Sequence, residues 1–469
     1  MNTRCTVGAR KVTVLGVFGL LGLPALASAQ QAAPPVINQA DTAWMLIATA
    51  LVLLMTPALA FFYGGLVRSK NALNTMMMSV ISLGFVGILW AVVGYSLAFA
   101  PNNALIGDLS RLFLNGVTTD PQGTIPHVLF MAYQGTFAII TAALISGAIV
   151  ERMRFSAYVV FISLWALIVY SPIAHWVWGG GWLAKMGALD FAGGTVVHVN
   201  AAVAALAAAI VVGKRQEYPS PSLIPHNVPF TLLGAGLLWF GWFGFNAGSA
   251  LAANNIAGLA FVTTMLAPAA TLVMWTFLDG FRSGKPTAVG AATAIVVGLV
   301  AVTPAAGFIS PMSAIALGAI AAVPSYFALV WRAKTSLDDS LDVIAAHGVG
   351  GTVGALLTGV FAQKSLNGIA DGALFGNPGQ LVIQGTAILA VIVYSGLASF
   401  VLLKLIGLVM PLRAAVGDES GGLDMSLHGE DAYPQSEGMA RPSATMLVAE
   451  PENLRQAVEA FSASSTPAR

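Results

Sequence analysis

Two histidines in matching motifs are the side chains of this sequence best suited to proton chemistry. His198 ends the motif Gly-Gly-Thr-Val-Val-His at residues 193–198, and His347 begins the motif His-Gly-Val-Gly-Gly-Thr-Val at residues 347–353. Both lie in apolar runs, where a charge would cost on the order of 3 kcal/mol, so we expect neutral imidazoles. Two facing neutral rings can share a hydrogen bond and still offer a nitrogen to a small solute. One ring alone would more simply bond a backbone carbonyl, but the matching positions favour a pore lining.

Asp190 is a second candidate for a functional role. It stands in an apolar stretch just ahead of Gly193 and Gly194. A carboxylate there could accept backbone N–H groups, fix the loop and place negative potential near an outer mouth. Asp342 precedes the other histidine in a similar way, but a solvated or helix-capping carboxylate explains it equally well.

Aromatic side chains concentrate in residues 175–178 and 239–245. An interfacial belt is the ordinary explanation for tryptophans in a membrane protein. A cation site would instead use ring faces and a hydroxyl to replace lost water, and each face would contribute about 0.5 to 2 kcal/mol. Phe137, Trp178 and Ser249 are candidates for such a site, and spacing alone leaves both explanations open.

The composition indicates what must position these residues. Of 469 residues, 57% are apolar and 9% are charged, against about 25% charged in a soluble domain. Lys and Arg number 21 and Asp and Glu number 20, so no basic field exists that would hold nucleic acid. The sequence has no metal-ligand cluster, phosphate loop or nucleophile elbow, so we expect neither an enzyme nor a cofactor. The composition predicts a helical membrane protein whose surroundings are the lipid bilayer.

The two ends of the chain differ from its centre. Residues 1–29 are interpreted as a secretory signal peptide, because a basic start precedes a short apolar run with small residues at its end; an uncleaved first helix is the alternative. The single cysteine, Cys5, lies in this segment, so the mature chain would hold no thiol. Residues 30–43 would form a short outer segment and residues 44–413 the membrane domain. Residues 414–469, rich in Gly, Ser, Glu and Pro, would form a partly disordered cytoplasmic tail.

Eleven apolar runs are long enough for helices that cross a bilayer, since a crossing needs about 20 residues. They lie near residues 44–66, 73–100, 126–150, 155–176, 194–213, 227–247, 255–278, 287–309, 312–331, 341–362 and 379–408. The loops after the odd-numbered runs hold ten cations and the opposite loops three, which places the N-terminus outside and the C-terminus inside. The ten are Arg68, Lys70, Arg152, Arg154, Lys214, Arg215, Arg282, Lys285, Arg332 and Lys334, against Arg111, Lys185 and Lys364.

The fifth and tenth runs, which carry His198 and His347, each end a block of five. Because five is odd, two such blocks must lie upside down relative to one another, which is the inverted-repeat plan of many transporters with sites between the repeats. The sequence therefore predicts an all-α integral membrane protein of two inverted five-helix repeats plus a final helix.

Several longer motifs resemble the ammonium transporter family (Amt/MEP/Rh). They are Gln-Gly-Thr-Phe-Ala around Phe137, residues 174–181, residues 187–198, residues 241–250 and the motif that begins at His347, followed in the tail by residues 422–424 and 428–433. The motifs occur in the right order from Asp41 to Tyr433. The sequence is therefore identified as a member of this family, of the bacterial Amt type.

The resemblance implies a homotrimer in a bacterial inner membrane, with a separate pore through each eleven-helix subunit. Phe137, Trp178 and Ser249 would form the outer site that recruits ammonium and discriminates it from water and metal cations. Phe137 and Phe245 would stack beneath it as a gate.

The same resemblance implies that His198 and His347 line a narrow apolar pore for ammonia, and that Asp190 supports recruitment or the fold. A trimeric P-II-type signalling protein at the cytoplasmic face is the partner that the family implies. The sequence departs from the family pattern at two places in the membrane domain. Tyr133 stands where bacterial members often carry phenylalanine, which would change the polarity of the outer vestibule, and residues 344–346 replace a commoner Phe-Gly-Val pattern before His347.

Two rival functions follow from the same residues. An ammonium sensor would bind ammonium and signal through the tail, but the tail holds no recognisable catalytic or kinase domain. A Rh-like gas channel fits less well, because Trp178 and Ser249 supply a cation site. Transport of ammonium or ammonia across the membrane is the function that we expect.

Overall fold

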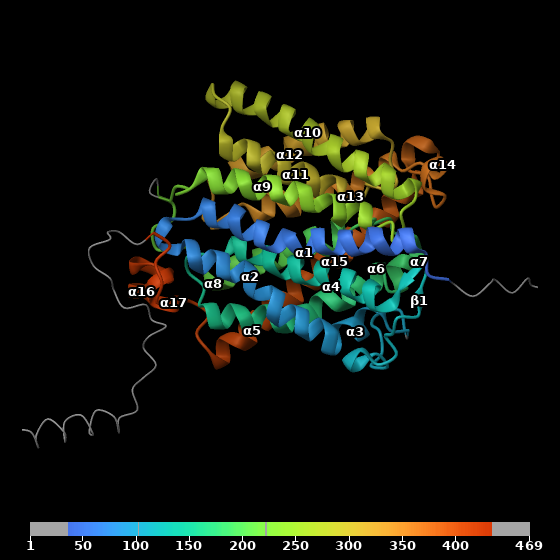
Figure 1. The fold of residues 1–469 in the computed structure, drawn as a ribbon. Coiled ribbons are helices and arrows are strands. Elements are labelled where there is room, and N and C mark those ends of the chain that lie inside the picture. The colour runs from blue at the N-terminus through green and yellow to red at the C-terminus, as the bar shows by residue number, and fades with distance from the viewer. Residues whose placement is uncertain (1–35, 102, 221–222, 434–469) are drawn as a thin grey trace, which may run out of the picture. The chain divides into compact units, whose positions relative to one another are not determined.

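The computed structural model describes residues 36–101, 103–220 and 223–433. Within them the chain is almost entirely helical, as the composition predicts (Figure 1). The α-helices are α1 (Gln39–Leu66), α2 (Ala72–Leu89), α3 (Tyr95–Phe99), α4 (His127–Leu144), α5 (Phe155–Trp165), α6 (Ser171–Val177), α7 (Trp182–Met186), α8 (Asn200–Val212), α9 (Val228–Trp242), α10 (Asn255–Ser283), α11 (Ala288–Val302), α12 (Pro311–Arg332), α13 (Gly350–Phe361), α14 (Lys364–Asn367), α15 (Gly379–Val409), α16 (Val416–Gly421) and α17 (Leu423–His428). The predicted signal peptide at residues 1–29, Cys5 and the predicted tail beyond residue 433 lie outside the described residues.

Short segments of other helix types join many of these helices. The π-helices are η2 (Trp90–Gly94), η5 (Ala166–Tyr170), η6 (Gly194–Val199), η7 (Phe243–Ala247) and η8 (Ile344–Val349). The 3₁₀-helices are η1 (Ser69–Asn71), η3 (Leu112–Leu114), η4 (Ile145–Ala148) and η9 (Ala373–Phe375), and the antiparallel strands β1 (Pro121–Gln122) and β2 (Ile125–Pro126) precede α4. Single π-helical turns occur frequently at functional sites, and both histidine motifs contain one.

Ten helical segments of the described chain are long and apolar enough to cross a bilayer. They are Gln39–Leu66, Ser69–Phe99, His127–Ala148, Phe155–Met186, Gly194–Val212, Val228–Ala247, Asn255–Ser283, Pro311–Arg332, Ile344–Phe361 and Gly379–Val409. The remaining predicted run, residues 287–309, forms the 15-residue helix α11 and a turn at residues 303–308. Pro304 explains the shorter helix, because proline has no N–H to continue the hydrogen-bond ladder.

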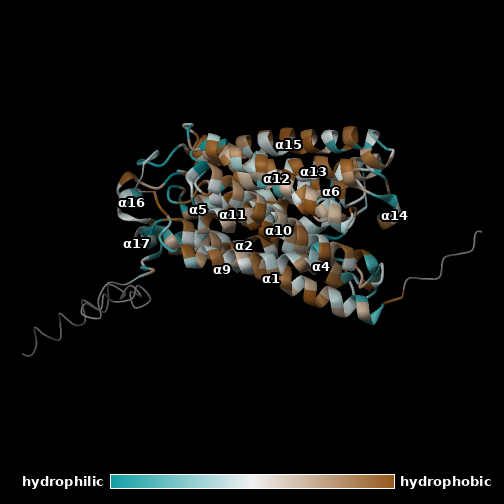
Figure 2. Ribbon diagram, turned by 90° about the horizontal axis from the view of Figure 1, so that it is seen from above, coloured by the Kyte–Doolittle hydropathy of each residue, from teal (hydrophilic) through white to brown (hydrophobic). Residues whose placement is uncertain are grey.

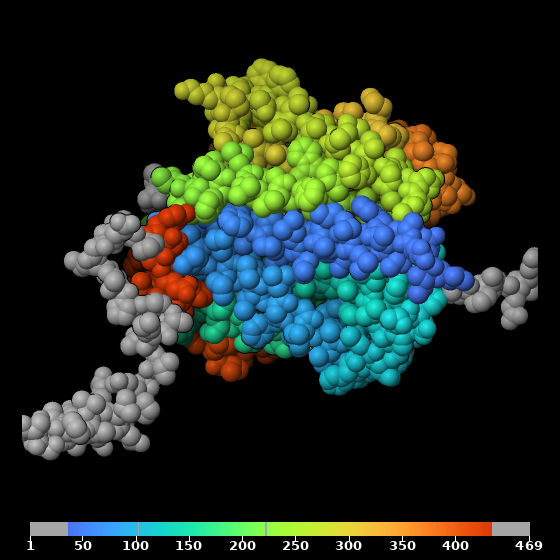
Figure 3. All heavy atoms as spheres, in the orientation of Figure 1, coloured from blue at the N-terminus to red at the C-terminus, as the bar shows by residue number. Residues whose placement is uncertain are grey.

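Small residues let neighbouring helices approach closely. α1 packs along α9, and α10 packs against α12 and α11 (Figures 1 and 3). A Cβ atom added to Gly234 in α9 would lie 2.4 Å from the backbone nitrogen of Phe62 in α1. A Cβ added to Gly318 in α12 would lie 2.1 Å from the carbonyl oxygen of Ala267 in α10. Such contacts suit a membrane protein, in which van der Waals packing drives helix association.

Polar residues gather at the two ends of the helices, while apolar residues run along their length (Figure 2). We call the end with α16 and α17 the inner end, and the end with α7 and α14 the outer end, after the orientation predicted from the loop charges (Figure 1). Part of the predicted tail is folded against the inner end. The carboxylate of Asp424 accepts hydrogen bonds from Leu73 N at 3.0 Å and Asn74 N at 2.8 Å, and so satisfies free amides at the start of α2.

Candidate functional site

A cavity of about 340 Å³ lies among the outer parts of α4, α6 and the turn after η7. We call it the outer vestibule, and it is lined by Phe99, Phe130, Gln134, Phe137, Val177, Trp178, Ser249 and Leu251. The structure therefore brings together the three residues predicted for a cation site. The rings of Phe137 and Trp178 meet edge to face with centroids 5.8 Å apart. The indole N–H of Trp178 donates to the carbonyl oxygen of Asp190 at 2.9 Å, which fixes the plane of the ring.

Two stacked phenylalanines close the floor of the outer vestibule. The rings of Phe137, from α4, and Phe245, from η7, have centroids 4.2 Å apart and an interplanar angle of 30°. Both side chains are about 1% exposed. Phe137 lines the vestibule, while Phe245 lines a second cavity next to the histidines. The stacked pair thus lies between the two cavities.

The carboxylate of Asp190 accepts hydrogen bonds from four backbone amides and one side-chain hydroxyl. Oδ1 accepts from Gly193 N at 2.9 Å and Gly194 N at 2.6 Å. Oδ2 accepts from Thr195 N at 2.8 Å and Val196 N at 3.2 Å, and also from the Thr195 hydroxyl. These amides begin η6, where a carboxylate compensates both the free N–H groups and the positive end of the helix dipole. Asp190 therefore positions the helix that carries the first histidine.

His198 and His347 face each other in the middle of the helical unit. Their Nδ1 atoms are 3.2 Å apart, and their ring centroids are 5.2 Å apart with an interplanar angle of 28°. The side chains are 1% and 3% exposed. Trp242 stacks on His198 at 5.5 Å and donates its indole N–H to the Thr303 hydroxyl at 2.9 Å. The first ring is thereby held from one side by Trp242 and from the other by His347.

The contact between the two Nδ1 atoms fixes how the rings share their protons. A hydrogen bond needs one donor, so one neutral ring carries its proton on Nδ1 and the other carries it on Nε2. The ring that donates through Nδ1 then has an acceptor at Nε2, and its partner has a donor there. The Nε2 atom of His198 is buried and lacks a hydrogen-bond partner among the described residues. The pair can therefore offer one donor and one acceptor to a small neutral molecule.

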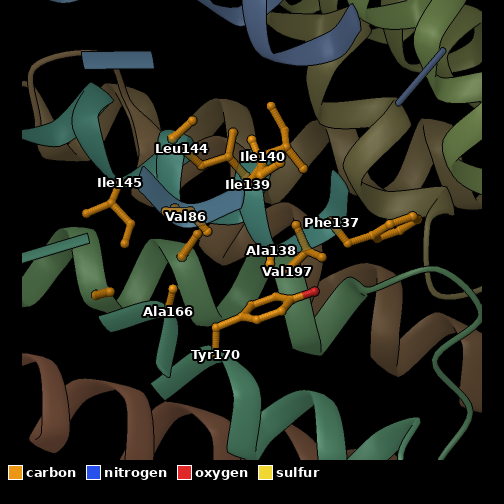
Figure 4. Close-up of a cluster of buried hydrophobic side chains, with 14 of the residues drawn as sticks. Val86, Phe137, Ala138, Ile139, Ile140, Leu144, Ile145, Ala166, Tyr170 and Val197 are labelled. Carbon is orange, nitrogen blue, oxygen red and sulfur yellow. The ribbon is translucent and has the colours of Figure 1, made fainter. Parts of the chain in front are cut away.

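A narrow cavity of about 10 Å³ lies beside the histidine pair. This volume is close to the minimum for one water-sized molecule. Its walls are apolar apart from the imidazoles and the indole, and consist of Met55, Leu59, Phe62, Ile140, Leu144, Val197, His198, Leu238, Trp242, Phe245, Val296 and His347. Figure 4 shows the aliphatic side chains of Ile140 and Leu144 on the same helix as Phe137, with Val197 close by. A bare cation would find little compensation in this cavity.

A wider cavity of about 330 Å³ lies on the inner side of the histidines. Tyr218 and Asp342 are among its lining residues, and Phe62 and His347 line both it and the narrow cavity. Phe62 therefore stands at the junction of the two spaces. Asp342 forms an ion pair with Arg332 and lies just before η8 (Ile344–Val349), so it is a paired carboxylate at a helix N-terminus rather than a free solvated one.

The family model described as Ammonium Transporter Family matches residues 43–433. This chain belongs to the ammonium transporter family. The ammonium transporter of Bacillus subtilis is 48% identical over 405 residues, 85% of this chain and 100% of that protein. The ammonium transporter of Aquifex aeolicus is 48% identical over 429 residues, 89% of this chain and 99% of that protein. The resemblance carried by the sequence motifs is therefore confirmed.

Solved structures of the ammonium transporter family have the same fold. Saccharomyces cerevisiae Mep2 aligns with a TM-score of 0.79 at 35% identity, covering 86% of this chain and 94% of that one. A structure named Sensor Amt Protein aligns with a TM-score of 0.78 at 32% identity, covering 82% of this chain and 98% of that one. The chain thus shares its fold with Mep2 and with a protein that is named as a sensor.

Buried ion pairs tie the inner loops of this family member together. Glu151 lies 2.8 Å from Arg68 Nε and 2.5 Å from Arg215 Nη1, and Arg215 Nη2 lies 2.8 Å from Asp338. Burial would raise the pKa of Glu151, but the guanidinium groups of Arg215 and Arg68 hold it below its usual value. The arginines whose positive charges predict the orientation of the chain in the membrane therefore also join the loops around the inner cavity. They fix the segment that leads to His347.

Several residues at the site were not singled out from the sequence. Phe62, at the junction of two cavities, belongs to an apolar run in which every position looks like lipid-facing or core sequence. Trp242, stacked on His198, belongs to the aromatic segment 239–245, whose spacing does not show which ring meets the site. The Phe-Phe-Tyr-Gly-Gly run at residues 61–65 was the available signal for Phe62. Tyr133 departs from the family pattern, and its hydroxyl lies within hydrogen-bond distance of Phe245 O and Ser249 Oγ.

Proposed function

We propose that this chain transports ammonium as ammonia and a separate proton: it recruits ammonium in the outer vestibule, removes one proton and conducts the neutral molecule past the histidine pair, and the proton crosses separately, so that each ammonium carries net charge. The observation that carries the proposal is a succession of three spaces, an aromatic vestibule, a cavity for one small molecule and a wider inner cavity, of which the first two adjoin the Phe137–Phe245 stack and the last two share Phe62 and His347. His198 and His347 lie at the narrow part.

Recruitment rests on the chemistry of the vestibule walls. The ring faces of Phe137 and Trp178 attract a cation, and each contributes about 0.5 to 2 kcal/mol. Ser249 donates its hydroxyl proton to the carbonyl oxygen of Phe245 at 2.8 Å, which leaves its oxygen lone pairs to accept from an N–H group. An acceptor beside π faces suits ammonium better than an anion, and ammonium has four N–H donors where a metal cation has none.

Proton removal follows from the cost of charge in the narrow cavity. An unpaired cation in an apolar channel is far less stable than in water, whereas neutral ammonia loses much less solvation free energy when it enters the channel. Ammonium that gives one N–H proton to a water molecule of the vestibule, at the Phe137–Phe245 gate, becomes ammonia, which the channel can hold. The acceptor and donor nitrogens of the histidine pair then replace the hydrogen bonds that ammonia makes with water.

The wider setting of this proposal comes from the family and the charge pattern. We infer an eleven-helix subunit of two inverted five-helix repeats and a final helix, with its N-terminus outside and its C-terminus inside. The matching π-helical turns of His198 in η6 and His347 in η8 support the repeat. A homotrimer in a bacterial inner membrane, a cleaved signal peptide and a P-II-type partner at the inner end complete the proposed assembly. Asp190 acts in it as a positioning residue.

An ammonium sensor that signals through its tail is the second candidate. The fold match to the protein named Sensor Amt Protein favours it, as does the packing of residues 416–428 against the inner end. Transport and sensing differ in one measurable property, because a sensor binds ammonium without sustained flux.

Ammonium-evoked current in proteoliposomes therefore tests the proposed function. Protein reconstituted in vesicles is exposed to a concentration jump of ammonium chloride, with protein-free vesicles and a potassium chloride jump as controls. A sustained current with ammonium, together with its loss on replacing either pore histidine, supports transport. Tryptophan fluorescence that responds to ammonium without any current would support the sensor instead.

A further inference from the structure

The carbonyl oxygen of the gate residue Phe245 is held by hydroxyl groups. It lies in the π-helical turn η7, after which the helix ends. The amides that would serve this carbonyl in a continuing helix donate elsewhere: Ser249 N donates to Asn246 O at 3.1 Å and Ala250 N donates to Ala247 O at 3.3 Å. In their place, the hydroxyls of Ser249 and Tyr133 lie 2.8 Å and 3.0 Å from the carbonyl oxygen.

Tyr133 reaches this carbonyl from the opposite side of the gate. It belongs to α4, one helical turn before Phe137, and its ring meets that of Phe137 at 5.0 Å. Its hydroxyl is also 3.0 Å from Gly244 O and 3.3 Å from Ser249 Oγ. The side chain is 1% exposed. A Cβ added to Gly248 would lie 2.7 Å from the hydroxyl oxygen, so the glycine leaves the space that the hydroxyl occupies.

The directions of these hydrogen bonds follow from the groups involved. A carbonyl oxygen only accepts, so the Tyr133 hydroxyl donates to the backbone of η7, and Ser249 donates to the same carbonyl. Because the Tyr133 proton is directed to backbone, the Ser249 oxygen keeps lone pairs for the vestibule. Because Tyr133 and Phe137 share α4, the bond also ties the helix of one gate ring to the backbone of the other.

We propose that Tyr133 is a positioning residue for selectivity: its hydroxyl fixes the spacing of the Phe137–Phe245 gate and the orientation of the Ser249 hydroxyl. This role rests on the proposed function, because it concerns the same vestibule and gate. A gate held at a fixed spacing opens for ammonium more readily than for bulkier methylammonium, which also has one N–H donor fewer.

Tyr133→Phe removes the hydroxyl and keeps the ring. Loss of one hydrogen bond of ordinary strength corresponds to about a threefold to tenfold change in a rate or binding ratio. We expect the ratio of methylammonium-evoked to ammonium-evoked current in proteoliposomes to rise by that factor, while the temperature of thermal unfolding in detergent changes little. Gly248→Ala provides a second variant, since its methyl group would displace the hydroxyl of an intact tyrosine, and it should raise the ratio in the same direction. The same methyl group would also lie 2.8 Å from Ala48 Cβ, so the unfolding temperature of this variant is measured alongside.

Tyr158→Phe is the matched control. Tyr158 is as deeply buried, but its hydroxyl donates to Ala142 O at 3.4 Å, away from the gate and vestibule. An unchanged current ratio in Tyr133→Phe, or an equal rise in Tyr158→Phe, would overturn the role of Tyr133 while ammonium current in the wild type left the proposed function standing. Absence of ammonium current in the wild type would overturn both.

Discussion

Asp190 and His198 are joined through one turn of π-helix, because the carboxylate of the first accepts the amide protons that begin η6 and the second lies later in η6. The carboxylate fixes the direction in which η6 leaves the loop. The ring of His198 therefore takes its place facing His347 at 3.2 Å through an anchor outside the narrow cavity.

Asp190→Asn should destabilise the protein and reduce flux together. An amide nitrogen cannot accept the N–H bonds that one carboxylate oxygen now accepts, and a buried unsatisfied group costs about 1 to 3 kcal/mol. Thermal unfolding in detergent and ammonium current measure the two effects. Asp120→Asn, in an exposed outer loop, is the control, and equal unfolding temperatures for the two variants would refute the anchoring role.

His198→Ala and His347→Ala should each abolish normal ammonium flux or selectivity while the assembly still forms. Each change removes one half of the Nδ1–Nδ1 hydrogen bond and leaves the other ring without that partner. Current in proteoliposomes and size-exclusion chromatography in detergent measure function and assembly. His226→Ala, whose ring contacts Val67 O and Tyr433 at the inner end, should retain current. Wild-type selectivity and flux in both pore variants would contradict the pore assignment.

Trp178→Leu should change the apparent affinity or rate for ammonium more than assembly. A lost ring face worth about 0.5 to 2 kcal/mol corresponds to a change of about twofold to thirtyfold in apparent affinity. Concentration dependence of the current measures this change. Trp331→Leu serves as control, since Trp331 is 66% exposed on α12. If neither affinity nor rate changes in Trp178→Leu, the indole belongs to an aromatic belt.

Two adjacent aspartates at the inner end should respond oppositely to pH. Burial and the neighbouring Asp342 carboxylate raise the pKa of Asp339 to about 7, against about 3.9 unfolded. The folded state therefore holds a proton that the unfolded state loses, and stability falls as pH rises from about 4 to about 7. Although burial opposes it, hydrogen bonding and charge from Arg215, together with the Arg152 charge, lower the pKa of Asp338. That carboxylate stabilises the fold above its unfolded pKa, and the contribution is lost as pH falls.

Asp339→Asn should accordingly gain stability over the wild type at about pH 8 and little at about pH 5. Asparagine keeps an oxygen for Ile344 N, which Asp339 now accepts at 2.7 Å. Asp338→Asn should lose about 3 kcal/mol at neutral pH, because it removes the carboxylate that pairs with the buried Arg152 and one of the two that pair with Arg215. Thermal unfolding in detergent at both pH values measures the difference. A loss of the same size in both variants at about pH 8 would show that the two carboxylates do not differ in ionisation.

Much of the membrane fold could be predicted because apolar length and loop charge are local properties of the sequence. Pro304 limits what run length can predict: the run at residues 287–309 is continuous in composition, but the missing N–H ends α11 at Val302. The folded position of Asp424 was equally hidden, because a Gly-rich and acidic tail gives no sign that one carboxylate will cap a helix far away in sequence.

The residues of the candidate site also differ in how well the sequence predicts them. His198, His347 and Asp190 are polar residues in apolar surroundings, so they stand out from the sequence. Phe62 and Trp242 do not, because their importance depends on which face of a helix meets the cavity, and tertiary packing decides that. The π-helical turns are equally hidden, since their shifted hydrogen bonds are a property of the folded backbone; in η6 they follow directly on the amides that donate to Asp190.

The cavity beside the histidines has room for about one water-sized molecule. Molecules in such a space cannot pass one another, so molecules that move inward and molecules that move outward share a single file. A molecule that enters from the inner end delays one that arrives from the gate. In the proposed transport, net movement still follows the difference in chemical potential across the membrane, but loading the inside with ammonia slows entry from outside without any change in the protein.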